Sequence, residues 1–156
     1  MSVKQAFRQF LAGASQLSAL GGRVYKRLPE GGPSVRPALT YRRVRVLRPK
    51  TQEGTGGLAR SAFEVDVWGG GDGPYQDASD LAEVVRPVLT GQDPVNYGPG
   101  FQGAIGYQDK AGQPQTVSVQ KTLADDEQDL DQAPGEFGRD YVQECVTLRF
   151  TVWHLE

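Results

Sequence analysis

Cysteine, histidine and long apolar runs are nearly missing from this 156-residue sequence, and each shortage excludes a class of function. The single cysteine, Cys145, excludes an internal disulfide framework and a cluster of thiolate metal ligands. The single histidine, His154, lies two residues from the end of the sequence. We expect this position to fray and to serve poorly in a nucleophile–base pair or a histidine metal site. We therefore predict a protein without enzymatic activity, cofactor or metal ion.

No apolar stretch approaches the roughly 20 residues that a membrane-spanning helix needs, and the first residues lack the apolar run of a signal peptide. The formal net charge of −2 provides no overall attraction to DNA or to an anionic membrane. Hydrophobic residues make up 38% of the sequence, and 20 glycines and 10 prolines indicate many connections. We expect one soluble globular domain over residues 1–156, made in the cytoplasm and without membrane contact.

Two segments have the apolar spacing of amphipathic helices. Residues 2–20 begin with Ser2 and Gln5, the pattern of a capping box, and continue with apolar residues three and four positions apart until two glycines stop the helix. Residues 77–91 repeat this spacing between an aspartate cap and a glycine stop. Pro87 removes a backbone donor inside the second helix, which predicts a kink or a tightened last turn.

Four segments alternate apolar and polar residues as half-buried strands do, namely residues 38–48, 59–68, 116–123 and 146–152. The order helix, strand, strand, helix, strand, strand predicts an α+β fold. We expect a mainly antiparallel sheet of about four strands, with two helices packed on one face and long loops.

The remaining segments predict connections. Residues 23–25 are a brief extended piece inside a loop, and residues 49–57 predict a hairpin link between the first two strands. Residues 91–114 are rich in turn residues and predict either a long hairpin or an ordered excursion. Residues 125–140 are too acidic to bury and predict a solvated loop.

Charge is unevenly distributed along the chain. Residues 23–50 hold nine cations against Glu30 alone, and residues 125–140 hold seven acids against Arg139 alone. Solvated loops, or pairing of the two segments within one chain, would explain this pattern structurally. Alternatively, the basic surface of one subunit meets the acidic surface of the next, in a head-to-tail contact that closes into a ring. A third hypothesis is that the basic strand follows a nucleic-acid backbone, although the overall acidity argues against strong DNA binding.

Two motifs resemble ligand sites only in part. The glycine-rich residues 69–74 lack the Lys-Ser or Lys-Thr of a phosphate-binding loop, so we expect a flexible connection. The acids from residue 125 onward occupy positions 1, 3, 5, 7 and 12 of a calcium loop, but Leu130 takes the place of the required glycine. A calcium-binding or hydrolytic module is therefore an alternative of another class.

The strand over residues 59–68 places Phe63 and its alternate neighbours on one face, and acidic residues and a tryptophan on the other. On the preceding strand, Val44 and Val46 share one face, and we expect Tyr41 to share the other with two arginines. We predict a sheet face that neighbouring subunits cover, made of Arg43, Arg45, Glu64, Asp66 and Trp68. Alternatively, the tryptophan caps the edge of its own core.

Five pieces of the sequence resemble, in their order and spacing, the tail-completion or tail-terminator proteins of long-tailed bacteriophages. These pieces are "LGGRVY", "PSVRPALTYRRV", "FEVDVWG", "ASDLAEVVRPVL" and "LRFTVWH". The segments 91–114 and 125–140 depart from the family pattern because they are longer than its compact form.

The resemblance implies a small α+β subunit that assembles, typically as a hexameric ring, on the end of a finished tail tube. There it would stop tube growth and join the tail to the head connector, in a phage virion or a related gene transfer particle assembled in the host cytoplasm. Its partners would be copies of itself, the tail tube protein and the head–tail connector protein, and DNA would only pass through the channel. Acidic residues would face this channel or a partner, namely Asp125, Asp126, Glu127, Asp129 and Asp131. The alternatives are a head–tail connector, as stopper or adaptor, and a tail tube subunit.

Overall fold

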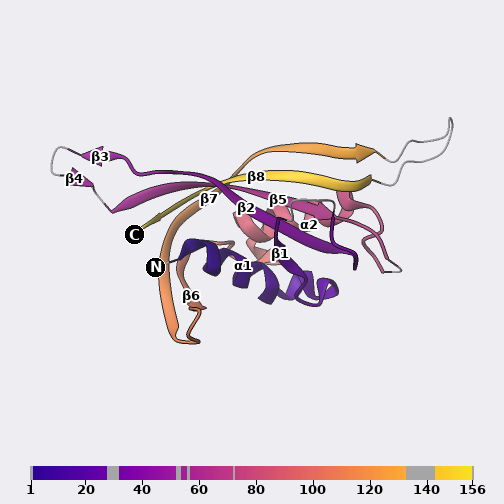
Figure 1. Ribbon diagram of the computed structural model, residues 1–156, viewed down its shortest axis with the longest axis horizontal. Helices are drawn as coiled ribbons and strands as arrows, with labels where there is room; N and C mark the ends of the chain where they lie inside the picture. Colours follow the sequence, from indigo (N-terminus) through magenta and orange to yellow (C-terminus); the bar gives the residue numbers. More distant parts are fainter. Residues whose placement is uncertain are drawn as a thin grey trace.

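The computed structural model describes residues 2–27, 32–51, 54–55, 57–71, 73–132 and 143–155. β-Strand is the commonest secondary structure in this part of the chain, and six strands form one sheet that curls into a half-barrel (Figure 1). Across the sheet the strands follow the order β1 (Val24–Lys26), β2 (Ala38–Leu47), β5 (Leu58–Trp68), β8 (Gln143–Leu155), β7 (Pro114–Gln132) and β6 (Gly103–Gln108).

The predicted fold class, a mainly antiparallel sheet of about four strands with two helices, is wrong. The sheet has six strands and is mixed, because β1 runs parallel to β2 while the other neighbours are antiparallel. The two additional strands, β1 and β6, come from segments that were expected to be connections. β1 has only three residues, and β6 has the sequence GAIGYQ, so neither shows the apolar alternation that identifies a strand.

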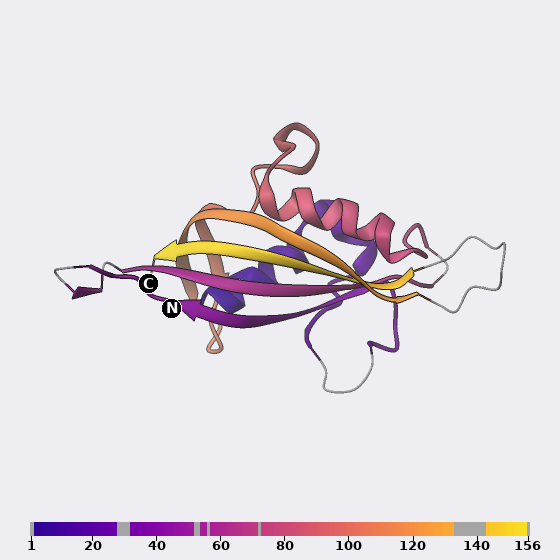
Figure 2. The ribbon, with the colours of Figure 1, turned by 90° about the horizontal axis from the view of Figure 1, so that it is seen from above.

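Two helices, α1 (Val3–Gly13) and α2 (Ala78–Thr90), lie on the concave face of the sheet (Figures 1 and 2). α2 packs against β5, β7 and β8, whereas α1 contacts β1 and β6. At the centre of this core, Phe7 of α1 stacks on Phe63 of β5 with 4.2 Å between ring centroids and meets Phe101 edge-on at 5.4 Å. The described helices therefore leave the convex face of the sheet uncovered.

The first helix is capped as predicted but is shorter than predicted. The Ser2 hydroxyl accepts a hydrogen bond from the backbone N–H of Gln5 at 3.3 Å. The backbone N–H of Ser2 donates to the Tyr107 hydroxyl at 2.8 Å, where a capping box would have it donate to the Gln5 side chain. α1 ends at Gly13, and the 3₁₀ helix η1 (Ser15–Leu20) continues to the predicted stop.

The second predicted helix is confirmed as α2, and it continues through Pro87 to Thr90. The N–H of Gly91 donates to the Pro87 carbonyl at 2.9 Å, so the last turn keeps α-helical spacing and is not tightened. The Thr90 hydroxyl also donates to the carbonyl of Arg86 at 2.9 Å.

The segment 91–114 holds the short helix α3 (Pro94–Tyr97) and β6, which forms a hairpin with β7. The structure thus combines the two alternatives for this segment: its first part is an ordered excursion with α3, and residues 103–114 form the hairpin. The expected solvated loop over 125–140 is wrong for residues 125–132, which belong to β7 and pair with β8. Backbone hydrogen bonds to a long partner strand hold this acidic segment extended without an apolar pattern of its own. The rest of that segment, 133–142, lies outside the described residues.

The predicted hairpin link between β2 and β5 is confirmed, because β3 (Lys50–Thr51) pairs antiparallel with β4 (Gly54–Thr55). Within the described ranges, no helix has both the length and the apolar character needed to cross a membrane.

Candidate interaction face

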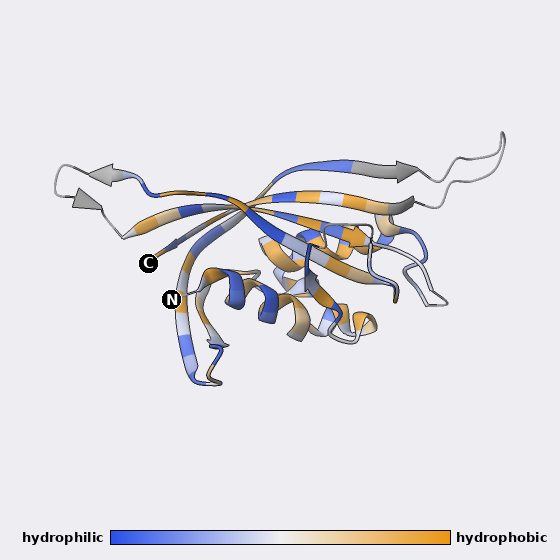
Figure 3. Ribbon diagram, in the orientation of Figure 1, coloured by the Kyte–Doolittle hydropathy of each residue, from blue (hydrophilic) through white to orange (hydrophobic). Residues whose placement is uncertain are grey.

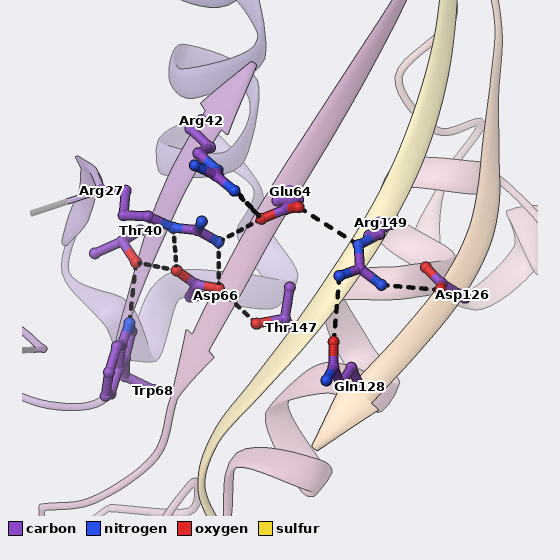
Figure 4. Close-up of polar contacts among 10 residues, drawn as sticks. All are labelled: Arg27, Thr40, Arg42, Glu64, Asp66, Trp68, Asp126, Gln128, Thr147 and Arg149. Carbon is purple, nitrogen blue, oxygen red and sulfur yellow. Dashed lines mark hydrogen bonds and ion pairs between the residues drawn. The ribbon is translucent and has the colours of Figure 1, made fainter. Parts of the chain in front are cut away.

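The convex face of the sheet carries a network of charged and hydroxyl side chains that runs across four strands (Figure 4). It arises because alternate residues of β5 point in opposite directions: Phe63, Val65 and Val67 enter the core, so Glu64 and Asp66 emerge on the convex side. We call this set the convex network; its members are Arg27, Thr40, Arg42, Glu64, Asp66, Trp68, Asp126, Gln128, Thr147 and Arg149.

A β-bulge in β2 changes the face on which the later residues of this strand lie. The register passes from Arg43, opposite Phe63, to Arg45, opposite Ala62, so Val44 is the extra residue. The prediction that Tyr41, Arg43 and Arg45 share one face is therefore wrong. Tyr41 and Arg43 pair with core-facing residues of β5, and Arg45 lies on the convex side beyond the bulge. The residue that meets Glu64 is the neighbouring Arg42.

Asp66 is the most enclosed acid of the network, with 4% of its surface exposed. The guanidinium of Arg27 donates to both of its carboxylate oxygens, from Nε to Oδ2 at 2.7 Å and from Nη2 to Oδ1 at 2.8 Å. The hydroxyls of Thr40 and Thr147, on the strands to either side, donate at 3.3 Å and 2.6 Å. Four hydrogen bonds from three strands or their flanks therefore compensate the buried charge.

Glu64 has three cationic neighbours. Its Oε2 lies 2.7 Å from Nη2 of Arg27 and 3.2 Å from Nη2 of Arg42, and its Oε1 accepts from Nε of Arg149 at 3.4 Å. Burial would raise the pKa of Glu64, but the hydrogen bonds and charges of these arginines, above all Arg27, outweigh it and hold the pKa below the usual 4.5. Glu64 is therefore ionised at neutral pH.

Arg149 extends the network to β7. Its Nη1 donates to Asp126 at 2.9 Å and its Nη2 to Gln128 at 3.2 Å. The neighbouring carboxylate of Asp125, at a second bulge, accepts from the Thr151 hydroxyl at 2.6 Å. These ion pairs join Arg27 and Arg42 of the basic segment to Glu64 and Asp66, and Asp126 of the acidic segment to Arg149, so they do not pair the two segments with each other.

The other predicted acids lie elsewhere. Glu127 points to the concave side, where it forms an ion pair with Arg86 of α2 at 2.7 Å. Asp129 and Asp131 belong to β7, and their side chains lie outside the described part of the structure. Since 125–132 is a continuous strand, it does not have the turns of a calcium loop.

Trp68 closes one end of the network and is half-buried. Its Nε1 donates to the Thr40 hydroxyl at 3.0 Å, and the guanidinium carbon of Arg36 lies 4.8 Å from the ring centroid. The backbone of Gly32 approaches the ring so closely that a Cβ there would lie 2.5 Å from Cζ3. The indole is therefore covered in part by its own chain, and in part remains available.

The expectation that His154 frays is wrong. It lies within β8, paired with Ala59 and Val119, with 2% of its surface exposed. Its Nε2 lies 2.7 Å from the hydroxyl of Ser61, which is fully buried on the core side of β5. A serine–histidine contact enclosed in the core has no access to a substrate, so it is part of the packing of the sheet.

Of the five residues predicted for a subunit interface, the structure joins Glu64, Asp66 and Trp68 in one network. Arg45 is exposed on the same face and forms no ion pair with a described residue, whereas Arg43 lies on the other side of β2. Sequence reasoning did not find the three arginines that compensate the acids, Arg27, Arg42 and Arg149. The register between β2 and β5 would have identified Arg42, because Arg42 and Glu64 are cross-strand partners. Arg27 and Arg149 depend on side chains that reach from other strands.

Comparison with known proteins gives no relative: no family model matches the chain, and no curated protein or solved structure matches it.

Proposed function

We propose that this protein is a structural subunit that closes into a ring on the end of a bacteriophage tail tube, stops tube growth and joins the tail to the head connector. One observation carries the proposal: the sheet has two open edge segments of opposite charge, one on β2 and one on β7. The sequence resemblance supports it, because each of the five pieces falls, in chain order, on elements of this fold: η1 and β1, then β2, β5, α2 and β8.

The basic open edge belongs to β2. β1 pairs with β2 only as far as the Lys26–Tyr41 position, and no other described strand pairs with that side of β2. The segment beyond this point, 42–47, has the sequence RRVRVL. It includes Val44, with 51% of its surface exposed, and the exposed Arg45. An uncovered strand edge of this kind is a template for another strand.

The acidic open edge belongs to β7. β6 pairs with β7 from Pro114 to Val119, and no other described strand pairs with that side of β7 in its remaining residues, which run to Gln132. Five acids lie on this segment, and the described end of its ribbon carries the hydrophilic colour in Figure 3. In this proposal, this acidic edge of β7 faces the next copy of the chain.

The strand directions fit such a contact. β2 is antiparallel to β5, β5 to β8, and β8 to β7, so β2 and β7 run in opposite directions. Rotation about an axis along the strands preserves their directions, so β7 of one copy would meet β2 of the next as an antiparallel pair. A contact between two different surfaces forms a closed ring when the rotation permits. Opposite charges would favour it and would disfavour pairing of two like edges.

Light scattering of the purified chain tests the contact between edges. Arg45→Glu reverses a charge on β2, and Asp129→Lys reverses one on β7. We expect the wild type to have a discrete mass that is a multiple of 17.0 kDa, each variant to shift toward the monomer, and the double variant to recover the assembled mass. Lys110→Glu, in the turn between β6 and β7, is the control and should leave the mass unchanged.

A wild-type chain that stays monomeric at every concentration, or a mass unaffected by Arg45→Glu, contradicts the proposed contact. A mass that grows without limit as the concentration rises favours the tail tube subunit. The role in the particle is tested by electron microscopy of tails assembled without this protein. We expect overlong tails that lack heads, and tails of normal length joined to heads contradict a terminator.

A further inference from the structure

A cleft of about 770 Å³ lies between the start of α1, the β1–β2 edge and the turn that joins β6 to β7. Its walls are held together by hydrogen bonds between distant parts of the chain. The N–H of Ser2 donates to the Tyr107 hydroxyl, and the side-chain amide of Gln9 both donates to the carbonyl and accepts from the N–H of Gln108, at 2.7 Å and 2.8 Å. The cleft is therefore a built part of the fold.

Four cations line this cleft: Lys4, Arg8, Lys26 and Lys110. None of them forms an ion pair with a residue that the structure describes, whereas the convex network has a carboxylate for each arginine that crosses it. The cleft therefore concentrates positive charge that the described chain does not compensate, although the whole protein is acidic.

Among the described residues that line the cleft there is one acid, Asp109, and its carboxylate is hydrogen-bonded within the turn that contains it. Its Oδ1 accepts from the backbone N–H groups of Ala111 and Gln113, both at 2.9 Å, and its Oδ2 from the side chain of Gln115 at 3.2 Å. The hydrogen bond from Gln113, with those from Ala111 and Gln115, lowers the pKa of Asp109. The carboxylate shapes the turn that carries Lys110, and four cations still face one acid.

A second observation points to a ligand. Tyr41 lines the cleft with 4% of its surface exposed, and its hydroxyl forms no hydrogen bond with a described residue. No fully enclosed polar side-chain atom among the described residues lacks a partner, so the hydroxyl reaches the cleft surface. Burial raises the pKa of Tyr41, although the charge of Arg8 acts in the opposite direction, so the hydroxyl keeps its proton at neutral pH. The hydroxyl is therefore a hydrogen-bond donor, and the packing of the Tyr41 ring beside Phe7 fixes its position.

We propose that this cleft binds a ligand with adjacent phosphate groups, such as a nucleic-acid backbone or a diphosphate. Three of the four cations are lysines, which act on phosphates as point charges, and the first turn of the 11-residue α1 adds the positive end of its dipole. Several cations around one cavity match a ligand with several charges better than a single carboxylate. Among the described residues that line the cleft, Tyr41 alone is aromatic, and its buried ring offers no platform for a base, so recognition is of phosphate. This inference does not depend on the proposed ring.

Calorimetric titration at low salt tests the cleft with three probes: pyrophosphate, a 20-base-pair DNA duplex and a hexaglutamate peptide. We expect binding of pyrophosphate, of DNA or of both, and the probe that binds identifies the source of the phosphate. The variant Lys4→Gln with Lys110→Gln should weaken binding at least tenfold, and Tyr41→Phe, which keeps the ring, about threefold to tenfold. Lys121→Gln, an exposed cation on β7 outside the cleft, is the matched control and should bind as the wild type does.

Absence of binding for both phosphate probes overturns the proposal. It is also overturned if hexaglutamate binds as tightly as the phosphate probes, because the cleft would then select charge alone, or if the double lysine variant binds normally. The lysines are exposed, so their replacement leaves the core intact, and a thermal melt of each variant checks this. A loss of ring assembly leaves these outcomes unchanged, which keeps the two proposals separable.

Discussion

The guanidinium of Arg27 reaches across β2 and donates two hydrogen bonds to the carboxylate of Asp66 on β5, at 2.7 Å and 2.8 Å. Arg27 follows β1 directly, and its backbone N–H also bonds to the carbonyl of Tyr41 at 2.9 Å. The three-residue edge strand is thereby attached to the sheet through a side chain as well as through its backbone. The acid, for its part, is buried only because this cation accompanies it.

Removal of this cation should destabilise the protein strongly. Arg27→Met leaves Asp66 buried without its main partner, so we expect the free energy of unfolding to fall by about 2–4 kcal/mol in urea titrations. Arg27→Lys keeps the charge but cannot form the two parallel hydrogen bonds, so its free energy of unfolding should lie between those of the wild type and Arg27→Met. Arg45→Met removes an exposed arginine of the same sheet and should change stability by less than about 0.5 kcal/mol. Equal effects of the Arg27 and Arg45 variants would contradict the structural role of the ion pair.

Glu64 should make stability depend on acid pH. Its pKa in the folded protein is below the unfolded value near 4.5, so its contribution is fully present above that value and is lost as the pH falls through the folded pKa. Glu64→Gln removes this dependence, so we expect a smaller loss of unfolding free energy between pH 7 and pH 3 than in the wild type. Chemical unfolding at a series of pH values measures the difference. Identical pH profiles would show that the arginines do not favour the ionised form.

The backbone of Gly32 should be intolerant of a side chain. A Cβ there would lie 2.5 Å from the Trp68 ring and 2.8 Å from Nη2 of Arg36, so Gly32→Ala has to displace the indole. We expect a cost of about 1–3 kcal/mol and a changed tryptophan emission spectrum. Gly13→Ala is the matched control, since its Cβ would meet no atom within 4 Å apart from its chain neighbours and the backbone of its own helix. Alanine also favours the helix, so this variant should stabilise by up to about 1 kcal/mol.

Phe7 should be the most costly ring to remove from α1, because it contacts Phe63, Phe101 and Tyr41. For Phe7→Ala we expect a loss of about 3–5 kcal/mol, from the lost burial and the cavity that remains. Val95→Ala, at a side chain that is 91% exposed, should change stability by less than about 0.5 kcal/mol. Thermal melts of the two variants compare them, and a small effect at Phe7 would contradict its central position.

The parts of the fold that the sequence predicts are those whose pattern is local. α2, β5 and β8 carry regular apolar spacing over several turns or alternations, and each lies where that spacing indicates. β1 and the far part of β7 could not be predicted this way, since three residues have no period and the acidic 125–132 has no buried stripe. Both are strands because a long neighbour supplies hydrogen-bond partners, which is a property of the tertiary structure.

The same limit applies to the convex network. Alternation along β5 correctly places Glu64 and Asp66 together, opposite Phe63. On β2 the alternation fails after Arg43, because the bulge at Val44 inserts one residue and reverses the faces that follow. A bulge has no reliable signature in a single sequence, so the face on which Arg45 lies could be named only with the register in view.

The two tryptophans of the chain give the convex surface an optical reporter of its own. Trp68 and Trp153 both lie on that side of the sheet, and each has an arginine over its ring, Arg36 at 4.8 Å and Arg60 at 5.5 Å. Tryptophan emission therefore originates from this surface, because the aromatic core beneath the helices holds phenylalanine and tyrosine rings but neither tryptophan. Any event that covers the surface or lifts a guanidinium from an indole will be recorded as a change in emission, in the unlabelled wild-type chain.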